Sequence, residues 1–510
     1  MNVVKRKAAF PFRSVLILLF TFSFLQPAFV RAQAPEEKIE VNLQAPSHPF
    51  PHYWEQMFGS GRAILSLRDS YRRDLRAVEE ATGFKYIRFH AIFHDEVGLY
   101  DEDSAGKTVY NFSYIDQIYD GLLENHVRPF VELSFMPQKL AATPPTFQSF
   151  WYKPIVSPPK DWNKWNDLIS HFARHLIERY GIDEVSQWYF EVWNEPNLDF
   201  WAGQPKDQTY YQLYDSTART LKQVDQRLRV GGPATAQAAW VDRFIRHAVD
   251  NNVPVDFVSS HVYANDLSQD VFGTDEKISR NEMVCRAIRK VHDQVAASPR
   301  KDLPIIWSEY NASYKNEPDV TDANFMGPWL ASTIGECDGL VNMLAYWAFS
   351  DVFEEQGVVK EPFYGGFGLI AEDGIPKPSF NAFKLLHGLG TTRIAMDSRS
   401  ALVTRREDGT IVMAVWNLFL PEEPGTNKRV TIDLTGTGAA DRATIYRLDS
   451  THGSSTAAYA AMGKPAFPTQ TQIESLRKAA ILPAPERIHV QHHQLTIDLP
   501  PQGLAVIEFR

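Results

Sequence analysis

Residues 187–195 read QWYFEVWNE, and Pro196 follows them at once. The run is short, aromatic and apolar, which is typical of a buried β-strand, and proline ends such a strand because it has no backbone N–H to donate. The carboxylate of Glu195 stands at this end. Burying an acid among tryptophans is costly unless the acid is paired, hydrogen-bonded or used in a reaction. The stretch therefore predicts a strand that delivers a carboxylate to a site.

Seven further stretches have the same character and alternate with amphipathic helical segments between about residues 50 and 385. The predicted strands are HYWEQMFG (52–59), KYIRFHAI (85–92), RPFVELSF (128–135), QWYFEVWNE (187–195), LRVGGPA (228–234), DFVSSHVY (256–263), PIIWSEY (304–310) and GLVNMLAYWAF (339–349). Eight strand–helix units in succession predict an α/β fold, a (β/α)8 TIM barrel. A doubly wound open sheet is the alternative, but the phosphate-binding turn typical of that fold is missing.

The pattern changes after about residue 390, where apolar and polar residues alternate between Gly, Asp and Pro turns. Such alternation predicts an antiparallel β-sandwich. Residues 468–480 have the pattern of one inserted helix. We therefore predict a signal peptide at 1–32, a catalytic (β/α)8 TIM barrel at 45–388 and a C-terminal β-sandwich domain at 389–510, which a strand from 36–44 can join.

The first residues have the pattern of a secretory signal peptide. Lys5, Arg6, Lys7 and Arg13 precede the apolar run SVLILLFTFSFLQPAFV, and small residues follow it. We predict cleavage after Ala32, and hence a secreted or periplasmic protein that is free of the membrane in its mature form. A membrane anchor is the alternative, although the run is short for a span.

The composition argues against several classes of function. A net charge of −10 disfavours nucleic acid or an anionic membrane as the main partner. No GxGxxG or GxxxxGK[ST] stretch stands between a strand and a helix, so we predict no nucleotide cofactor. The two cysteines, Cys285 and Cys337, have neither CxxC spacing nor a histidine cluster, so we predict no metal site. They can pair in an exported protein or remain two buried thiols.

Two glutamates stand at the ends of predicted strands. Barrel enzymes place their reactive groups at the C-terminal strand ends, and Glu195 ends the fourth strand while Glu309 ends the seventh. Two carboxylates over an aromatic pocket are the apparatus of glycoside hydrolysis, in which one protonates the leaving oxygen and the other attacks the sugar or activates water. The candidates for stacking on the sugar ring are Trp193, Trp307, Tyr346 and Trp347.

A second glutamate of the fourth strand has a different expected role. Side chains alternate along a strand, so Glu191 shares the parity of Glu195 and should face the barrel interior below it. A buried carboxylate needs a partner, and Arg88 in the second strand is the candidate.

The wider sequence resembles glycoside hydrolase family 39, the group of β-xylosidases and α-L-iduronidases. The similar segments are HYWEQMFGSGRA, TGFKYIRFHAIFHDEVGLYDED, VYNFSYIDQIYDGLLENHVRPFVELSFMP, FEVWNEPNLDFW, SHVYAND, WSEYNAS, YWAFSDVFEEQG and FYGGFGLI. The ordered set is far more specific than WNEP alone, and it covers nearly all of the mature chain. The resemblance implies a retaining glycosidase that acts on an oligosaccharide or glycoside and needs no cofactor.

The resemblance also implies roles for single residues. Glu195 would be the general acid/base, Glu309 the nucleophile, and Asn194 the residue that binds the sugar 2-hydroxyl. The other candidate substrate-binding residues are His52, His90, His261, Tyr263, Trp347 and Glu355. Glu354 is an alternative to Glu355, because one step along the loop changes which acid points inward. A proline-rich loop after the third strand contains Phe147, Trp151 and Tyr152. We expect these side chains to pack within the loop, and contact with the leaving group of the substrate is the alternative.

The implied mechanism is double displacement with retention of configuration, which requires the two carboxyl groups to lie about 5–5.5 Å apart. Glu309 must be ionised and Glu195 protonated at the start. Charging Glu309 first raises the pKa of Glu195, since like charges close together disfavour the second ionisation.

The charged residues in the predicted site motifs indicate which class of sugar the site binds. An iduronidase must bind a carboxylate, which calls for a nearby cation, whereas SHVY, WSEY and YWAFSDVFEEQG contain neither Lys nor Arg. A neutral sugar is therefore favoured, and an exo-acting β-xylosidase is the leading interpretation. An arabinosidase or galactosidase, an endo-acting polysaccharide hydrolase and a non-catalytic carbohydrate-binding protein stay open as alternatives. A binding protein has no need of the acid pair. The sequence does not determine the oligomeric state.

Overall fold

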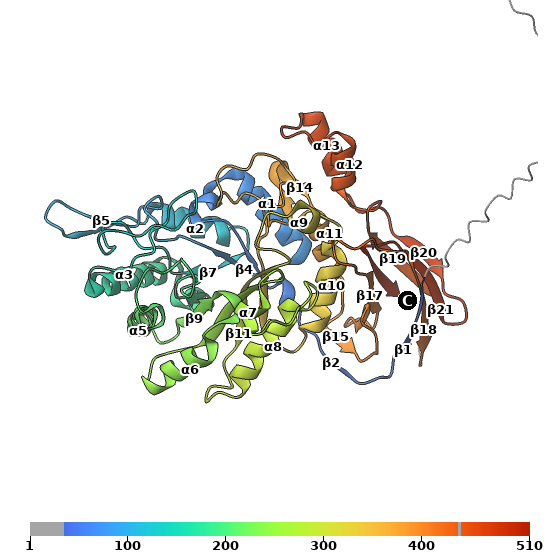
Figure 1. Ribbon diagram of the computed structural model, residues 1–510, viewed down its shortest axis with the longest axis horizontal. Coiled ribbons are helices and arrows are strands. Elements are labelled where there is room, and N and C mark those ends of the chain that lie inside the picture. The colour runs from blue at the N-terminus through green and yellow to red at the C-terminus, as the bar shows by residue number, and fades with distance from the viewer. Residues whose placement is uncertain (1–34, 437–439) are drawn as a thin grey trace, which may run out of the picture. The chain divides into compact units, whose positions relative to one another are not determined.

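The computed structural model describes residues 35–436 and 440–510, so the predicted signal peptide at 1–32 lies outside the described residues. Eight parallel strands close into a barrel and follow one another around it in chain order (Figure 1). They are β3 (Met57–Gly59), β4 (Tyr86–Phe89), β7 (Arg128–Glu132), β8 (Tyr189–Glu191), β9 (Arg229–Thr235), β10 (Phe257–Tyr263), β11 (Ile305–Asn311) and β12 (Met343–Tyr346). The predicted TIM barrel is confirmed.

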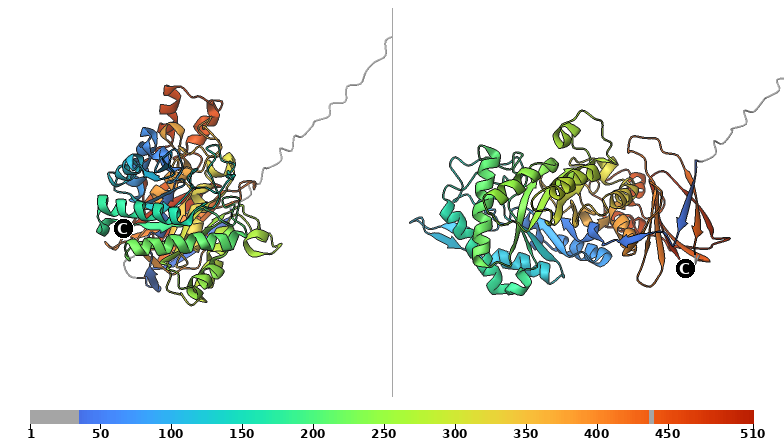
Figure 2. Two further views of the ribbon diagram at one scale, coloured as in Figure 1. Left: turned by 90° about the vertical axis from the view of Figure 1, so that its left-hand side faces the viewer. Right: turned by 90° about the horizontal axis from the view of Figure 1, so that it is seen from below.

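Helices follow each strand and surround the barrel (Figure 2). They are α1 (Asp69–Thr82), α2 (Ser113–Leu123), α3 (Trp162–Tyr180), α4 (Ile182–Val185), α5 (Lys206–Val224), α6 (Val241–Asp250), α7 (Ser268–Phe272), α8 (Met283–Ala296), α9 (Pro318–Thr321), α10 (Met326–Glu336) and α11 (Pro378–Leu386). Their apolar residues recur at helical spacing, as in α1, where Tyr71, Leu75 and Val78 are buried. Local caps also contribute: Asp161 accepts the first free N–H groups of α3.

Short elements decorate the loops between strands and helices. The antiparallel hairpin β5 (Tyr100–Glu102) and β6 (Thr108–Tyr110) follows β4, and the hairpin β13 (Ile370–Ala371) and β14 (Ile375–Pro376) precedes α11. The 3-10 helices are η1 (Tyr53–Glu55), η2 (Ala63–Leu67), η3 (Ala236–Ala238) and η4 (Glu372–Gly374).

The C-terminal part forms two facing sheets, as predicted. One has the order β2 (Ser47–Pro49), β15 (Thr392–Ile394), β16 (Ala401–Arg405), β17 (Ile411–Asn417), β22 (Gly503–Phe509), β19 (Arg442–Leu448) and β20 (Glu486–His489). The other has the order β1 (Glu36–Asn42), β18 (Lys428–Thr435) and β21 (Gln494–Leu499). The strand expected from 36–44 is present as β1, and it runs parallel to β18. Because β2 pairs with β15, residues 47–49 also belong to these sheets.

Alternation along β17 shows how the sandwich is fixed to the barrel. Ile411, Met413 and Val415 lie in the core between the two sheets. Val412, Ala414 and Trp416 lie in the large core of the barrel, together with residues of α10. Since successive side chains of a strand point to opposite faces, one strand serves both cores.

An excursion between β19 and β20 contains two helices, α12 (Ser455–Ala461) and α13 (Gln470–Ala479), of which the sequence pattern predicted only the second. They project from the sandwich near β14 (Figure 1). Tyr459, Ile473 and Leu476 form a small apolar cluster with Ile375 of that hairpin. The excursion is therefore packed against a barrel loop.

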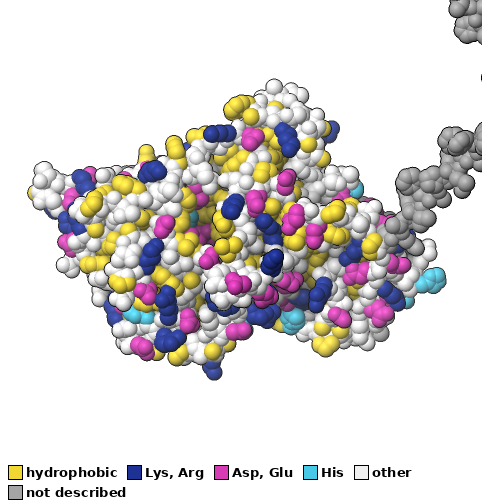
Figure 3. All heavy atoms as spheres, viewed as in Figure 1, with side chains coloured by type: hydrophobic (Ala, Val, Ile, Leu, Met, Phe, Trp, Pro, Cys, Tyr) yellow, Lys and Arg dark blue, Asp and Glu magenta, His cyan; other side chains and the backbone are white. Residues whose placement is uncertain are grey.

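Cys285 of α8 and Cys337, directly after α10, form a disulfide bond, which settles the choice between a bridge and two thiols. Acidic and basic side chains are interspersed over the face of the molecule in Figure 3, without a continuous basic stripe on that face. In the part of the chain that the structure describes, no helix combines the length and the apolar character needed to cross a membrane.

Candidate active site

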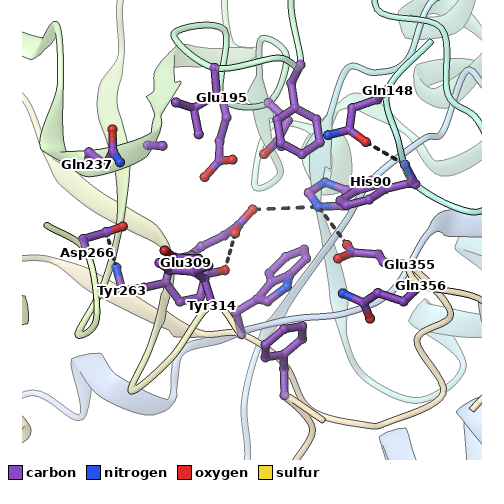
Figure 4. A pocket seen from close by; sticks show the side chains of 17 residues that line it. His90, Gln148, Glu195, Gln237, Tyr263, Asp266, Glu309, Tyr314, Glu355 and Gln356 are labelled. Atoms are coloured by element: carbon purple, nitrogen blue, oxygen red, sulfur yellow. Dashed lines mark hydrogen bonds and ion pairs between the residues drawn. The ribbon is translucent and has the colours of Figure 1, made fainter. Parts of the chain in front are cut away.

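A cavity of about 400 Å³ lies at the C-terminal ends of the barrel strands (Figure 4). Seven of the nine residues predicted to form the site line it: His90, Asn194, Glu195, Tyr263, Glu309, Trp347 and Glu355. They come from β10, β11 and the loops after β4, β8 and β12, so segments far apart in the sequence meet here. His261 is fully buried in contact with Glu195, and His52 lies elsewhere.

Glu195 is placed by a turn rather than by a continuous strand. β8 ends at Glu191, and the backbone at Trp193 (φ 73°) and Glu195 (φ 43°) is left-handed. Such conformations cost about 1–3 kcal/mol each and persist only where the surroundings enforce them. The Glu195 N–H donates to the carbonyl of Ala234 at 2.8 Å, which holds the turn against β9. The turn brings the Glu195 carboxyl over the cavity (Figure 4).

Glu195 and Glu309 face each other across the cavity. One carboxylate oxygen of each, together with one ring nitrogen of His261, all lie within 4.8 Å of one another. Retaining glycosidases have their two carboxyl groups about 5–5.5 Å apart, whereas inverting enzymes need about 6.5–9.5 Å to admit a water molecule. The short separation fits the retaining geometry.

Glu309 lies within β11, and both of its carboxylate oxygens accept hydrogen bonds. Arg88 Nη1 donates to its Oε1 at 2.6 Å, and the phenolic hydroxyl of Tyr263 donates to its Oε2 at 2.7 Å. Both oxygens are thereby fixed, and the group is oriented towards the cavity.

Arg88 is the central cation below the cavity, and its guanidinium is completely buried. Besides Glu309, it contacts Glu191 Oε2 at 2.6 Å through Nε and Glu132 Oε2 at 2.8 Å through Nη2. The predicted Arg88–Glu191 pair is confirmed. Burial alone would lower the pKa of Arg88, but the surrounding carboxylates raise it above its usual value. Arg88 also donates to Asn194 Oδ1 at 2.9 Å, which leaves the amide NH₂ of Asn194 for a substrate hydroxyl.

Glu195 has the opposite electrostatic setting. Burial, and next the negative charge of Glu309, raise its pKa well above the usual value. Among the described residues, its side-chain hydrogen-bond partner is His261, whose Nδ1 lies 3.0 Å from Glu195 Oε1. Burial, together with the positive charges of Arg88 and His90, lowers the pKa of His261 well below its usual value, so this imidazole is neutral. Glu195 is therefore held in its protonated form, while its neighbour Glu309 accepts hydrogen bonds from Arg88 and Tyr263, so the two carboxyls lie in the different settings that acid-assisted displacement needs.

His90 and Trp347 form a second wall of the cavity. His90 Nδ1 lies 2.7 Å from Glu132 Oε2, and although burial opposes it, this carboxylate raises the pKa of His90 above its usual value. The rings of His90 and Trp347 are 4.7 Å apart. The indole also packs on Gly59 at the end of β3, where a Cβ would lie only 2.0 Å from Trp347 Cε3. Glycine at this position therefore permits the indole to lie there.

The structure distinguishes Glu354 from Glu355. Arg68 Nη1 lies 2.6 Å from Glu354 Oε1 and Arg62 Nη1 lies 3.2 Å from its Oε2, so this acid points away into an ion pair. The backbone at Glu354 is left-handed, with φ 62°, which turns the next side chain to the other side. Glu355 lines the cavity, and burial raises its pKa to about 8. The residue chosen from the resemblance is the one that faces the site.

The prediction for His52 is not supported. The first barrel strand begins only at Met57, and residues 53–55 form η1. His52 therefore lies before the N-terminal end of that strand, whereas the cavity lies at the C-terminal ends. Its Nδ1 is 2.6 Å from Glu55 Oε1, and its ring stacks on Trp54 with centroids 4.5 Å apart. These contacts make it a packing residue.

Three of the four aromatic candidates for a sugar platform are core residues, and only Trp347 lines the cavity. Trp193 packs against Trp201, with ring centroids 5.1 Å apart, because the left-handed turn removes it from the parity of Glu191. Trp307 is fully buried in β11, and Tyr346 packs on Phe383.

Several cavity residues were missed because they lie in irregular loops. They are Gln148, Phe150, Leu198, Phe200, Ala236, Gln237, Asp266, Tyr314, Gln356 and Phe367. The proline-rich loop was recognised, but Phe147 and Trp151 are about half exposed, while Gln148 and Phe150 face the cavity. Gln237 has a left-handed backbone, which strand or helix periodicity does not predict. Asp266 had a usable signal, since it is an acid three residues after SHVY.

Comparison with known proteins agrees with this geometry. Residues 37–488 match the sequence model of Glycosyl hydrolases family 39. The chain belongs to this family. A β-xylosidase from Geobacillus stearothermophilus is 39% identical over 440 residues, which cover 84% of this chain and 86% of that protein. The crystal structure of a monomeric β-xylosidase from Caulobacter crescentus CB15 has a TM-score of 0.84 and 32% identity, covering 93% of this chain and 99% of that one.

A more distant relative is the human α-L-iduronidase, which is 25% identical over 312 residues, or 56% of this chain and 44% of that protein. As a family 39 member, the chain is a glycosidase whose substrate is a carbohydrate. The carboxyl pair and the cavity described above are the features of the fold that fit this activity.

Proposed function

We propose that this family 39 glycosidase is an exo-acting β-xylosidase, which releases xylose from xylo-oligosaccharides or β-xylosides with retention of configuration. The observation that carries the proposal is the pair Glu195 and Glu309, whose carboxylate oxygens approach within 4.8 Å in electrostatically opposite settings. The Geobacillus stearothermophilus and Caldicellulosiruptor saccharolyticus relatives, both named β-xylosidases, are 39% and 35% identical to the chain.

In the first step, Glu309 attacks the anomeric carbon and forms an ester bond to the sugar. The bond from that carbon to the leaving oxygen breaks, and Glu195 transfers its proton to this oxygen. Arg88 and Tyr263 each donate to one oxygen of Glu309 and hold it in position. Asn194 offers its amide to the 2-hydroxyl, a contact that strengthens as the transition state forms.

In the second step, Glu195 is ionised and takes a proton from water. The water oxygen attacks the anomeric carbon, the ester bond to Glu309 breaks, and the sugar leaves with its original configuration. Glu195 is protonated again at the end, so the cycle closes without an external acid or base.

Charge in the cavity supports a neutral sugar. The residues that line it include neither Lys nor Arg. A uronate carboxylate would meet the acids Glu355 and Asp266 without a bidentate cation of the kind that recognises carboxylates. Glu355 is protonated near neutral pH because burial raises its pKa to about 8, so it can both donate to and accept from sugar hydroxyls.

Exo action is supported by the closed side of the cavity. The Trp151 N–H donates to the Glu355 carbonyl at 2.7 Å, which joins the loop after β7 to the loop after β12. Arg62 lies over the Tyr152 ring at 4.9 Å and also binds Glu354, which ties the two loops together. These contacts join the loops on the side of the cavity where Glu355 lies, and a closed glycone side is what exo action requires.

The proposal includes export from the cytosol. The Cys285–Cys337 disulfide supports it, because such bonds persist in oxidising compartments. The predicted cleavage after Ala32 is tested by N-terminal sequencing of the protein recovered outside the cytosol. A mature chain that retains its first residues would contradict this part of the proposal.

A panel of nitrophenyl glycosides tests the sugar and the anomer together. We expect the highest kcat/KM for the β-D-xyloside and release of xylose alone from xylo-oligosaccharides. A preference for an arabinoside, a galactoside or a uronide would overturn the assignment of the sugar. Oligosaccharide products from xylan would overturn exo action.

A further inference from the structure

A chain of hydrogen bonds runs from Glu195 into the barrel interior. Glu195 Oε1 lies 3.0 Å from His261 Nδ1, and His261 Nε2 lies 3.1 Å from Ser308 Oγ. Ser308 Oγ donates to Glu191 Oε1 at 2.7 Å. The chain ends at Arg88, whose Nε donates to Glu191 Oε2 at 2.6 Å. His261, Ser308, Glu191 and Arg88 are completely buried, so solvent does not supply alternative partners.

The order of donors along this chain fixes one tautomer of His261. A serine hydroxyl has one hydrogen, and Ser308 gives it to Glu191. His261 Nε2 must then carry the hydrogen that it shares with Ser308. A neutral imidazole has only one N–H group, so Nδ1 has a bare lone pair. The hydrogen between Nδ1 and Glu195 Oε1 therefore belongs to the Glu195 carboxyl.

The reverse order of donors, in which His261 Nδ1 donates to Glu195 and Glu191 donates to Ser308, is disfavoured by the charges around Glu191 and Glu195. It would put a proton on Glu191, beside the guanidinium of Arg88, and a negative charge on Glu195. Burial raises the pKa of Glu191, but Arg88 opposes that rise through direct contact.

More acidic groups than cations act on the Glu195 carboxyl. The charged and titratable groups that act on it, besides His261, are Glu309 of β11, Asp266 after β10, Glu355 after β12 and Arg88 of β4. Arg88 makes its contacts with Glu191, Glu309 and Glu132, so the negative charge is stabilised at Glu191 and not at Glu195.

We propose that Glu191 and Ser308 hold His261 as the Nε2–H tautomer, and that His261 thereby acts as a positioning residue that keeps the proton on Glu195 until a substrate oxygen takes it. The catalytic use of this proton rests on the proposed function. The tautomer itself does not.

The same arrangement acts on the second step. Once Glu195 has given up its proton, a His261 locked with its hydrogen on Nε2 has none to donate through Nδ1. The Glu195 carboxylate is left without this hydrogen bond and stays a stronger base towards the incoming water. One fixed tautomer therefore favours both the acid and the base role of Glu195.

Ser308→Ala tests the proposal by its pH profile. Without the acceptor at Nε2, His261 is free to place its hydrogen on Nδ1 and donate it to the Glu195 carboxylate. This favours the ionised form, and we expect the alkaline limb of kcat/KM to move down by about one pH unit, the scale of one charge-assisted hydrogen bond. Ser308→Thr keeps the hydroxyl and should restore the wild-type limb.

Ser260→Ala is the matched control. Ser260 is equally buried and lies next to His261, but its hydroxyl donates to the carbonyl of Thr235 at 2.7 Å. Ser260 is therefore not part of the series of hydrogen bonds from Glu195 to Arg88. We expect its alkaline limb to stay at the wild-type position. An unmoved or raised limb in Ser308→Ala, or the same shift in Ser260→Ala, would overturn the proposal.

Neutron diffraction from deuterated wild-type crystals gives a readout that does not depend on activity. We expect deuterium on His261 Nε2 and on Glu195 Oε1, and none on His261 Nδ1. Deuterium on Nδ1 would overturn the proposal even if the enzyme proves to be a β-xylosidase. The predicted pattern in a protein without β-xylosidase activity would support the tautomer and reject the proposed function.

Discussion

Tyr263 donates its phenolic hydrogen to Glu309 Oε2 at 2.7 Å, from a strand that lies directly beside the strand of Glu309. The neighbouring strands β10 and β11 thus supply both the proposed nucleophile and the group that orients it. Arg88 holds the other oxygen of the same carboxylate.

Tyr263→Phe removes this hydrogen bond and little volume. A hydrogen bond to a charged group contributes about 1.5–3 kcal/mol, and about 1.4 kcal/mol corresponds to a tenfold change in rate. We expect kcat to fall by about 10- to 100-fold on a nitrophenyl β-xyloside with a small change in KM. Tyr446→Phe, in β19 of the sandwich, is the control and should keep wild-type kcat. Unchanged kcat in Tyr263→Phe would contradict the assigned role.

Arg88→Met tests the buried charge network. The substitution leaves Glu191 buried without its cation and Glu132 with His90 alone, and breaking a buried pair in this way costs about 3–5 kcal/mol. We expect a loss of that size in the free energy of unfolding, measured by urea denaturation. Arg442→Met is the control, because the Arg442 side chain is 82% exposed and its change should stay within about 0.5 kcal/mol. Equal free energies of unfolding for the two variants would show that Arg88 does not compensate the negative charge of these buried carboxylates.

Glu355→Gln tests the environment of the acid behind the cavity. Burial raises the folded-state pKa of Glu355 from 4.5 to about 8, so the folded protein binds this proton more tightly than the unfolded chain does. The resulting stability is present below about pH 4.5 and is lost as the pH rises through about 8. Relative to Glu355→Gln, the wild type should lose about 1.4 kcal/mol per pH unit within this window.

Glu354→Gln gives a comparison of opposite sign. Burial alone would raise the pKa of Glu354, but Arg68 and Arg62 lower it, so its contribution to stability is present above pH 4.5 and lost as the pH falls. Urea denaturation at about pH 3, 5 and 8.5 separates the two variants, because the Glu354 contribution changes below pH 4.5 and the Glu355 contribution changes between pH 4.5 and about 8. The same pH dependence in both would contradict the finding that the two acids face different surroundings.

The disulfide is expected to stabilise the barrel. Cys285 and Cys337 are separated by 52 residues, and a closed loop of that length corresponds to about 4 kcal/mol in the chain-entropy model. We expect the double variant Cys285→Ser, Cys337→Ser to lose stability of this order and to become insensitive to dithiothreitol. A wild-type Tm that does not change on complete reduction would contradict the prediction.

Much of the fold was accessible from the sequence, because the barrel strands are short apolar runs at regular intervals. The positions of Glu195 and Glu309 followed from strand ends, and the Arg88–Glu191 pair followed from side-chain parity. The errors lie where the backbone leaves periodic structure. HYWEQ reads as part of a strand but forms η1, which misplaced His52. The left-handed residue Trp193 breaks the parity that suggested a sugar platform.

The periodicity of the sequence could not predict the loops that complete the cavity, for the same reason. Gln237 and Asp266 are brought together by the connections after β9 and β10, whose irregular backbones carry no repeating pattern. The choice between Glu354 and Glu355 depends on a single left-handed residue and on Arg68, which lies 286 positions away. Tertiary contacts decide such cases.

Covalent trapping tests the central claim most directly. A 2-deoxy-2-fluoro-β-xyloside with a good leaving group slows both displacement steps, but the leaving group lets the first proceed, so the glycosyl-enzyme accumulates. We predict that peptide mass spectrometry finds one fluoroxylosyl group, attached to Glu309, and that the enzyme regains activity as the group is hydrolysed. Attachment to Glu195 or another residue, or hydrolysis with inversion and no covalent species, would contradict the account.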